Sequence, residues 1–388
     1  METIYLDNNA STRIAEPVFE AMEPFIREHY GNPSSIHRAG QAARHAVEIA
    51  RAQVADLIGA RPRDVVFTSG GTEADNLAIL GTLAAYPNKR HLVISAVEHV
   101  AVHALAERLA RENHRVSFIP VDARGTLDLE AFEAAIDDET TLASVMLANN
   151  ETGVIFPIPE IARLTASRGI PLHVDAVQAA GKMELDIRAL GADLISLSAH
   201  KIHGPKGVGA LIVGRGARLR NILSGGHQER DLRPGTHNVF GIVGFGAAAE
   251  LAGSGIEAFS TRVADQRNRL ERGILDRVDR ASIIGDRDRR LANTTYIAFE
   301  TLEAEAILIA LSERGVCASS GSACGSGSLE PSHVLKAMGL DERIAHGAVR
   351  FSLSRETTDA EIDLALEIIP EVVNKLAGLC PATMGTGN

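Results

Sequence analysis

The chain has 388 residues and a formal net charge of −11, with 45% hydrophobic and 23% charged residues. This length allows one large domain and a smaller one, and the composition is ordinary for a globular enzyme. Because the charge is negative and no basic patch is visible, the sequence argues against a nucleic-acid partner. The start METIYLDNNA lacks the pattern of a signal peptide, and no stretch approaches the roughly 20 apolar residues that span a bilayer. We therefore expect a cytoplasmic protein with no membrane partner.

From about residue 65, short apolar segments alternate with amphipathic helical patterns. The segments that we expect to form strands are 64–69, 91–97, 115–121, 141–147, 170–176, 193–199 and 208–214, and the patterns typical of helices cover 100–112, 127–136 and 159–169. This alternation predicts an α/β fold with a mostly parallel sheet between layers of helices. In such sheets ligands bind at the carboxyl ends of the strands, so the site is expected there.

After residue 255 the pattern changes. Helices are expected over 256–278, 303–315 and 358–378, and strands over 293–300 and 348–354. We interpret this part as a second, smaller α+β domain that the N-terminal segment joins. The predicted division is a large domain over 16–255 and a small domain over 1–15 and 256–388.

The first candidate site is VVFTSGGTEADNLAIL, residues 65–80. A strand is expected to lead into Gly70 and Gly71, and a helix to begin near Thr72. Free backbone N–H groups and the helix dipole suit an anion, and the two glycines let the backbone approach it closely. Taken alone, the pattern favours a tight turn capped by Thr72 over a phosphate site.

The second candidate is a carboxylate and a lysine at the same sheet edge. Asp175 is expected at the end of one strand, and Lys201 lies just past the end of a later one. A Schiff-base lysine and a carboxylate that keeps a pyridine nitrogen protonated are what pyridoxal phosphate requires. An ordinary ion pair fits the spacing equally well, and Lys206 competes for the role of the lysine. Metal binding by His200 and His203 is disfavoured, because glycine and proline lie nearby.

Two further side chains are expected to end strands at that edge, namely His99 and Asn150. A histidine there could stack on a flat ring and move protons near neutral pH, although each residue alone is typical of a strand end. Arg350 lies inside the apolar strand 348–354, where a buried charge needs a partner. Either a structural carboxylate or the carboxylate of a substrate would serve.

The three cysteines, at positions 317, 324 and 380, are odd in number and widely spaced, which favours reduced thiols. Cys324 lies in SSGSACGSGSLEPSH, residues 319–333, among glycines and serines that give a loop conformational freedom. A surface loop with an incidental cysteine is the alternative. The spacing matches no iron–sulfur cluster motif.

Together these motifs resemble the cysteine desulfurases, most closely the NifS type and then the IscS type. The segments that carry the resemblance are YLDNNAST (5–12), GNPSSIH (31–37), TSGGTEADN (68–76), EHVAV (98–102), ANNETG (148–153), HVDAVQAAGK (173–182), SLSAHKIHGPKGVG (196–209), GGHQERDLRPGT (225–236), SSGSACGSGSLEPSHV (319–334) and VRFSLSRETT (349–358). The ending GSLEPSHV is most similar to the nitrogen-fixation branch. The family commonly has threonine after the nucleophile, where this chain has Gly325.

The resemblance implies the type I pyridoxal-phosphate fold, a homodimer, and roles for individual residues. Lys201, rather than Lys206, would carry the pyridoxal 5′-phosphate, and Arg350 would bind the carboxylate of the substrate. The other implied cofactor and substrate contacts are Asp175 to the pyridine nitrogen, Gln178 to the ring hydroxyl, His99 stacked on the ring, Asn150 lining the pocket, Gly71, Thr72, Ser198 and His200 around the phosphate, and Thr236 reaching in from the other subunit.

By the same resemblance, Cys324, on a loop of about residues 318–330, is the nucleophile that takes sulfur from L-cysteine as a persulfide and leaves alanine. The sulfur would pass to an iron–sulfur scaffold or another acceptor protein, in nitrogen fixation or in general cluster assembly. No metal ligand is assigned, beyond Cys324 as a transient cluster ligand. The alternatives are another pyridoxal-phosphate enzyme of this fold, such as a selenocysteine lyase or an aminotransferase, and a non-catalytic sulfur carrier.

Overall fold

The structure, a computed structural model, describes residues 3–214, 216–321 and 332–379. Its main sheet has seven strands in the order β2-β8-β7-β6-β5-β3-β4. These strands are β2 (Val65–Thr68), β3 (His91–Ser95), β4 (Arg115–Ile119), β5 (Thr140–Ser144), β6 (Leu172–Asp175), β7 (Leu194–Ser198) and β8 (Gly209–Val213). All pairs from β7 to β4 are parallel, and β8 alone runs antiparallel to both of its neighbours. The predicted α/β fold with a mostly parallel sheet is confirmed.

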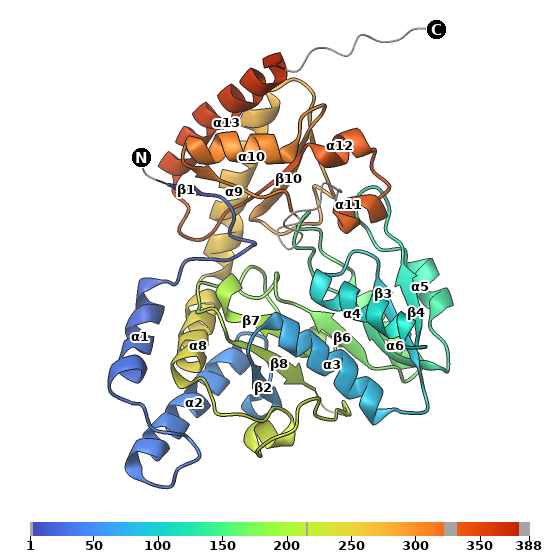
Figure 1. The fold of residues 1–388 in the computed structure, drawn as a ribbon, viewed down its shortest axis with the longest axis vertical. Helices are drawn as coiled ribbons and strands as arrows, with labels where there is room; N and C mark the ends of the chain where they lie inside the picture. The colour runs from blue at the N-terminus through green and yellow to red at the C-terminus, as the bar shows by residue number, and fades with distance from the viewer. Residues whose placement is uncertain (1–2, 215, 322–331, 380–388) are drawn as a thin grey trace.

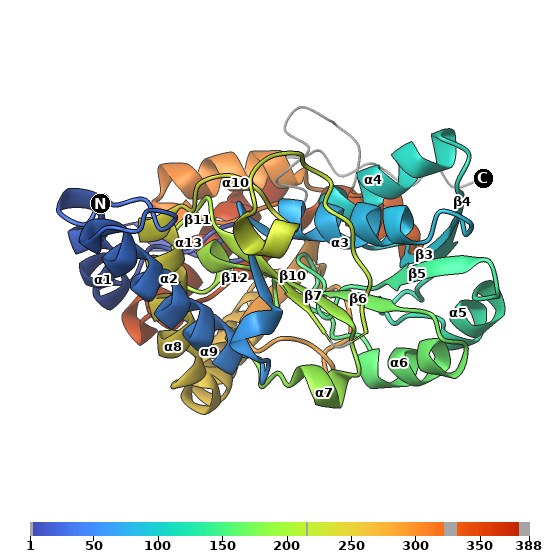
Figure 2. The same cartoon turned by 90° about the horizontal axis from the view of Figure 1, so that it is seen from below.

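Helices cover both faces of this sheet (Figures 1 and 2). The helices of this part are α1 (Glu16–Arg27), α2 (Arg38–Asp56), α3 (Gly71–Ala85), α4 (Val100–Arg111), α5 (Leu129–Ala135), α6 (Ile158–Ser167), α7 (Ile187–Leu190) and α8 (Val239–Gly253), with the short 3-10 turns η1 (Pro62–Asp64), η2 (Ala199–Lys201) and η3 (Gln228–Asp231). One face packs against α3 and α4, and the other packs against α2, α5, α6 and α8. This is the layered arrangement that the alternating sequence pattern predicts.

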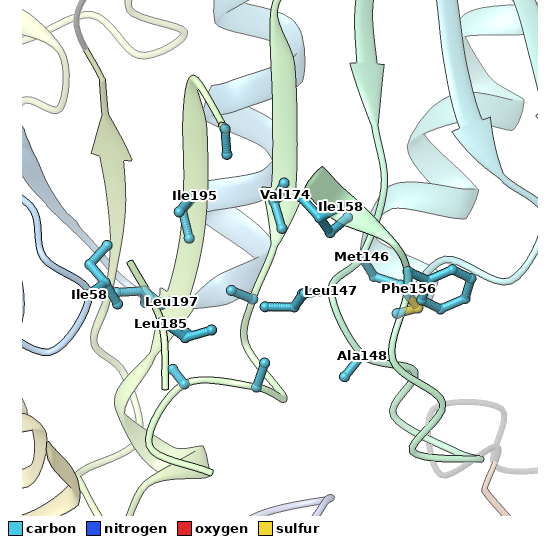
Figure 3. Packing of buried hydrophobic residues seen from close by; sticks show 14 of the residues in the cluster. Ile58, Met146, Leu147, Ala148, Phe156, Ile158, Val174, Leu185, Ile195 and Leu197 are labelled. Atoms are coloured by element: carbon cyan, nitrogen blue, oxygen red, sulfur yellow. The ribbon is translucent and has the colours of Figure 1, made fainter. Parts of the chain in front are cut away.

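Alternation along the strands assigns each side chain to one layer. In β7, Ile195 and Leu197 belong to the core beneath α2 and α8, whereas Leu194 belongs to the core beneath α3. Successive side chains of a strand point to opposite faces, so a strand buried on both faces is mostly apolar, and its buried polar residues pair with each other, as His173 Nε2 does with Ser196 Oγ at 2.9 Å. Figure 3 shows this packing, with Ile195 of β7 and Val174 of β6 among the apolar side chains of the first core.

The remaining elements form a second group, in the upper part of Figure 1. They are β1 (Ile4–Tyr5), α9 (Ile256–Leu275), β9 (Ala281–Ile283), β10 (Thr294–Phe299), α10 (Ala304–Glu313), β11 (Val316–Cys317), α11 (His333–Ala337), α12 (Glu342–His346), β12 (Ala348–Ser352) and α13 (Asp359–Leu379). Strands β12, β10 and β9 form an antiparallel sheet, and β1 pairs with β11 in parallel. Ile4 and Leu6 share a separate hydrophobic cluster with residues from Phe259 onward. The division into domains over 16–255 and over 1–15 with 256–388 stays a proposal, which this separate cluster supports.

Within the described ranges, no single helix is long and apolar enough to cross a membrane. Among the described helices, only α8 and α9 taken together meet the length and composition of a span, and they are bent by 73° at their junction.

Candidate functional site

The ends of three strands, β6, β7 and β2, lie at the carboxyl edge of the main sheet. Asp175 is the last residue of β6, Ser198 is the last residue of β7, and β2 leads through Gly70 into α3. A Cβ placed on Gly71 would lie 2.9 Å from Val177 Cγ2 and 3.7 Å from Ser198 Cβ. Glycine therefore lets α3 begin close to the ends of β6 and β7, where a larger residue would force Val177 to shift.

The N-terminus of α3 carries the features of an anion site. Its N-cap residue is Gly70, and no side chain caps it in the described structure. Thr72 is exposed in the first turn, so the expectation that Thr72 caps the helix is wrong. Ser198 Oγ is buried and has no hydrogen-bond partner among the described residues. Uncapped N–H groups beside an unsatisfied buried hydroxyl can bind an oxyanion such as phosphate.

Lys201 lies at the end of η2, directly after β7. Its Nζ donates hydrogen bonds to the backbone oxygens of Asn9, at 2.6 Å, and Ala10, at 2.9 Å. Lys206 is exposed and lines a different cleft of about 750 Å³ beside the N-terminal segment. Of these two lysines, only Lys201 has an electrostatic interaction with Asp175.

The side chain of Asp175 is buried in an environment of low dielectric constant. It is 6% exposed, and its Oδ1 accepts a hydrogen bond from Val177 N at 2.9 Å. Burial raises the pKa of Asp175 to about 6, although the Val177 N–H and the charge of Lys201 oppose the rise. Burial and the neighbouring Asp175 also raise the pKa of Asp75. Two buried acids side by side favour a ligand that brings a positive charge, such as a protonated ring nitrogen.

His99 does not end a strand, as the sequence suggested, because β3 stops at Ser95. His99 is instead the N-cap of α4, where its Nδ1 accepts a hydrogen bond from Ala101 N at 3.2 Å. Burial and the charge of Lys201 lower the pKa of His99 to about 4. The ring is therefore neutral near pH 7, and because Nδ1 is an acceptor, its proton is on Nε2.

The other histidine of this edge, His200, is also neutral. Burial and the charge of Lys201 lower the pKa of His200 to about 4, and its Nδ1 lies 3.3 Å from Ser11 Oγ. His203 has its Nδ1 3.0 Å from Arg13 O. In residues 3–214, 216–321 and 332–379, no group of three His, Cys, Asp or Glu side chains could hold a metal ion.

Asn150 lies six residues beyond the end of β5, in a turn, so its placement at a strand end is corrected. Its Oδ1 is buried without a hydrogen-bond partner among the described residues. Its backbone oxygen accepts hydrogen bonds from Asn9 Nδ2, at 3.2 Å, and Arg350 Nη1, at 2.8 Å. Gln178 lies nearby, since its Nε2 donates to Asn9 O at 2.9 Å.

Asn9 connects these groups, and the sequence did not single it out. Its backbone oxygen accepts from Lys201 and Gln178, and its Oδ1 accepts from Lys182 Nζ at 3.2 Å and Asn293 Nδ2 at 3.0 Å. Burial lowers the pKa of Lys182 well below its usual value, and the charge of Lys201 adds to this effect. The sequence feature that could have pointed to Asn9 is the pair of asparagines in YLDNNAST. It predicts no role by itself, because the partners of Asn9 lie far away in the sequence.

Arg350 lies in β12 and is 2% exposed. Its Nη2 donates to Asp7 Oδ1 at 2.7 Å, so the protein itself supplies the carboxylate that a buried charge needs. The need for an anionic partner therefore no longer favours a substrate. Arg350 Nε has no hydrogen-bond partner in the described ranges, and this N–H, with the second N–H of Nη1 and of Nη2, remains for a ligand.

Thr236 is exposed, in a loop that a buried ion pair anchors. Glu229 receives hydrogen bonds from Arg51 Nη1, at 2.7 Å, and Nη2, at 2.8 Å, and from Phe67 N, at 2.8 Å. Glu229 and the two residues after it have positive φ angles of 47°, 56° and 65°. This conformation is costly for residues other than glycine, so the ion pair must compensate for it.

We expect Glu229→Ala to destabilise the protein by about 3 kcal/mol, because the buried Arg51 would lose its bidentate, buried carboxylate and keep only the exposed Glu48, 3.2 Å from its Nε. The measurement is the free energy of unfolding in urea. Glu371→Ala is the matched control, since it removes an equally bidentate but exposed pair with Arg314. Equal losses of stability in the two variants would contradict the anchoring role.

The cysteines are the remaining residues that the sequence singles out. Cys317 lies in β11 and is half-buried. Cys324, most of its predicted loop of residues 318–330, and Cys380 lie outside the described residues. The structure therefore brings together Lys201, Asp175, Ser198, Gly71 and His99, whereas it leaves the place of Cys324 untested.

Residues 4–365 match the family model described as aminotransferase class-V. The chain is 50% identical over 381 residues to a cysteine desulfurase of Nostoc sp., covering 98% of this chain and 95% of the relative. It is 48% identical over 388 residues to the cysteine desulfurase NifS of Azotobacter vinelandii, covering 100% of this chain and 96% of the relative. A solved NifS-like protein, 37% identical, superposes with a TM-score of 0.90 over 96% of this chain and 100% of its own. The chain therefore belongs to the class-V aminotransferases and, within them, to the cysteine desulfurases of the NifS type.

Proposed function

We propose that this protein is a pyridoxal-phosphate-dependent cysteine desulfurase, which converts L-cysteine to L-alanine and takes the sulfur onto Cys324 as a persulfide. The observation that carries the proposal is Lys201 beside the buried Asp175, at the carboxyl edge of the sheet, in a chain of this family. A lysine and an acid so placed have the roles that this cofactor requires.

The residues of the edge fit the cofactor of the family, pyridoxal 5′-phosphate. Ser198 Oγ and Asn150 Oδ1 are buried polar atoms without partners among the described residues, so a polar ligand would satisfy them. The uncapped start of α3 at Gly71 suits the phosphate group. Asp175, whose pKa burial raises, suits the protonated ring nitrogen.

We assign the individual contacts from the family resemblance, which this geometry supports. Lys201 would bond covalently to the cofactor, Asp175 would hold its ring nitrogen, and His99 would stack on its ring. The remaining contacts would be Gln178 to the ring hydroxyl, Asn150 to the pocket wall, Gly71, Thr72, Ser198 and His200 to the phosphate, and Thr236 to the phosphate of the second copy in a homodimer.

When bound, the cofactor supplies an electron sink that weakens the bond between Cβ and sulfur of the substrate. The side chains around it hold and move protons. Lys201 Nζ, which the oxygens of Asn9 and Ala10 position, lies close enough to Asp175 to lower the pKa of that acid, and when neutral it can act as a base. His99, neutral with its proton on Nε2, can donate a hydrogen bond at pH 7.

The thiolate of Cys324 would then attack the sulfur of the substrate. One S–S bond forms, the C–S bond breaks, and the carbon takes up a proton before alanine leaves. The persulfide sulfur would pass to an iron–sulfur scaffold or another acceptor protein in the cytoplasm, for nitrogenase or for general cluster assembly. In such a transfer Cys324 would also be the group that a cluster could bind transiently.

Arg350→Ala is expected to weaken cysteine binding and to leave the spectrum of the bound cofactor intact. Loss of a charge-assisted hydrogen bond to the carboxylate of the substrate costs on the order of 2–3 kcal/mol, which is roughly one to two powers of ten in KM. The change in KM is measured by steady-state kinetics with L-cysteine.

Asp7→Asn is the matched control, since it removes the other partner of the same ion pair. If Arg350 binds the substrate, Asp7→Asn leaves KM nearly unchanged. If both variants lose stability and neither changes kcat/KM for cysteine, Arg350 is a structural residue only.

The function is tested by the products that the purified protein forms from L-cysteine with a thiol reductant present. A desulfurase yields alanine and sulfide in equal amounts. An aminotransferase yields a keto acid only when an amino-group acceptor is added, and a selenocysteine lyase prefers selenocysteine strongly. A sulfur carrier yields no alanine, and that result would refute the proposal.

A further inference from the structure

Two buried side chains outside the cofactor site lie between the two described ends of the segment that bears Cys324. Glu151 follows Asn150 in the turn after β5 and is 2% exposed, and Tyr296 lies in β10 and is 0% exposed. The described chain stops at residue 321 and resumes at residue 332. The proposed function gives neither Glu151 nor Tyr296 a role.

Tyr296 holds the end that precedes the segment. Its Oη donates a hydrogen bond to Ser320 O at 2.7 Å. The next residue, Gly321, has a φ angle of +85°, and a Cβ placed on it would lie 2.6 Å from Tyr296 Oη and 2.9 Å from Glu151 Oε2. The backbone thus approaches both side chains too closely for any residue but glycine.

Glu151 holds the end that follows the segment. Ser332 Oγ donates a hydrogen bond to Glu151 Oε1 at 2.8 Å, and it also accepts one from Val334 N at 3.0 Å as the N-cap of α11. Next to it, His333 Nε2 lies 2.8 Å from Glu98 O, on the residue just before His99. This end is therefore fixed to Glu151 and to the loop that carries His99.

A hydrogen bond between Glu151 and Tyr296 would join these two ends, and the protons available on the two side chains decide whether it can form. A tyrosine hydroxyl has a single proton, and Tyr296 gives it to Ser320 O. Glu151 Oε2 lies near this hydroxyl, since both atoms border the same side of Gly321 and the two side chains interact, yet it receives no hydrogen bond within the described ranges. If Glu151 is protonated on Oε2, it can donate to Tyr296 Oη, and every group is then satisfied. An ionised Glu151 would instead compete with Ser320 O for the same proton.

Burial favours the protonated form. It raises the pKa of Glu151, against opposing effects of the hydrogen bond from Ser332, the charges of His333 and Arg350, and the nearby hydroxyl of Tyr296. The neighbouring Tyr296 also stays neutral, since burial raises its pKa well above the usual value. A neutral pair of donor and acceptor is what the hydrogen-bond chain requires.

We infer that Glu151 and Tyr296 are positioning residues, which join Ser332 to Ser320 by a chain of hydrogen bonds and so hold together the two ends of segment 322–331. The inference rests on the proposed function, because it is Cys324 on that segment that must reach the substrate. A fixed pair of ends limits the region that the cysteine can search, which raises its effective concentration at the site.

Four variants test the inference. Tyr296→Phe removes the hydroxyl, Glu151→Ala removes the carboxyl group, and Glu151→Gln keeps one acceptor for Ser332 and one donor for Tyr296. Tyr5→Phe is the matched control, since it removes a hydroxyl that also donates to a backbone oxygen, that of Ser11 at 2.9 Å. Each variant is measured in the holoenzyme for KM and for persulfide formation in a single turnover. Hydrogen–deuterium exchange reports on the peptides that contain Gly321 and Val334.

Tyr296→Phe and Glu151→Ala are expected to keep KM for cysteine within about twofold and to form persulfide roughly tenfold more slowly, as for the loss of one buried hydrogen bond. Exchange at both peptides should become faster. Glu151→Gln and Tyr5→Phe should match the parent protein in all three measurements.

Unchanged exchange or an unchanged persulfide rate in Tyr296→Phe would overturn the inference, and so would a Glu151→Gln variant as impaired as Glu151→Ala. Tyr296→Phe decides the question even where Glu151→Ala fails to fold. If the parent protein forms no persulfide, the proposed function fails, whereas the exchange data still show whether the two ends are joined.

Discussion

Lys201→Ala is expected to fold and to bind pyridoxal phosphate only reversibly, with activity lower by roughly two to four powers of ten. The loss is chemical, because Nζ is the covalent attachment and the base beside Asp175. Folding is expected to survive, because the oxygen of Asn9, one of the two that Nζ contacts, keeps its hydrogen bond from Gln178.

The measurement is the visible absorption of each variant after extensive dialysis. Lys206→Ala is the matched control, since Lys206 is exposed and lies in a neighbouring cleft. It should retain the absorption of lysine-bound cofactor, which Lys201→Ala should lose. The reverse pattern would assign the covalent attachment to Lys206 and would overturn the site described here.

Cys324→Ala is expected to fold, to keep the absorption of the bound cofactor and to bind cysteine, yet to release almost no sulfide. The reason is that the thiolate is the group that accepts sulfur, and alanine cannot replace a nucleophile. The variant changes no contact of Lys201 or Asp175 that the structure describes. Sulfide release with a thiol reductant measures the effect.

Cys317→Ala and Cys380→Ala are the controls. Cys317 is half-buried in β11, where its backbone pairs with Tyr5. Both controls should retain most of the activity. A Cys324→Ala variant that releases sulfide nearly as fast as the parent protein would show that the thiol of Cys324 is not the acceptor.

The sheet and its ligand-binding edge could be predicted from sequence because the strands are buried on both faces. Mostly apolar segments such as those of β6 and β7 predict buried strands. Because the strands are parallel, the polar residues that follow them lie at the same edge of the sheet. Asp175 and Lys201 were placed together for this reason, and the structure brings them together.

The ends of β5 and β3 could not be predicted in the same way. Residues 145–148 continue the apolar run after β5 and are buried, and hydrogen bonds from Val145 N to His173 O and from Leu147 N to Asp175 O continue the contact with β6 beyond the end of β5 at Ser144. Hydrophobicity does not mark the residue at which the regular strand ends, so the predicted strand extends to residue 147. His99 was missed as a helix cap because histidine is not among the residues that usually cap helices.

The contacts of Asn9 and Arg350 are tertiary and leave no local pattern. Arg350 pairs with Asp7 across 343 positions of the sequence, and this partner removed the main argument for a substrate carboxylate. Glu151 and Tyr296 likewise read as ordinary residues of a turn and a strand. Such partners become visible only when distant segments are folded together.

Mass spectrometry of the protein after a single turnover with L-cysteine, without reductant, tests the central claim most directly. We predict one added sulfur atom on the peptide that contains Cys324 and one molecule of alanine for each sulfur. Alanine without protein-bound sulfur, or sulfur found on Cys317 or Cys380 instead, would contradict the account.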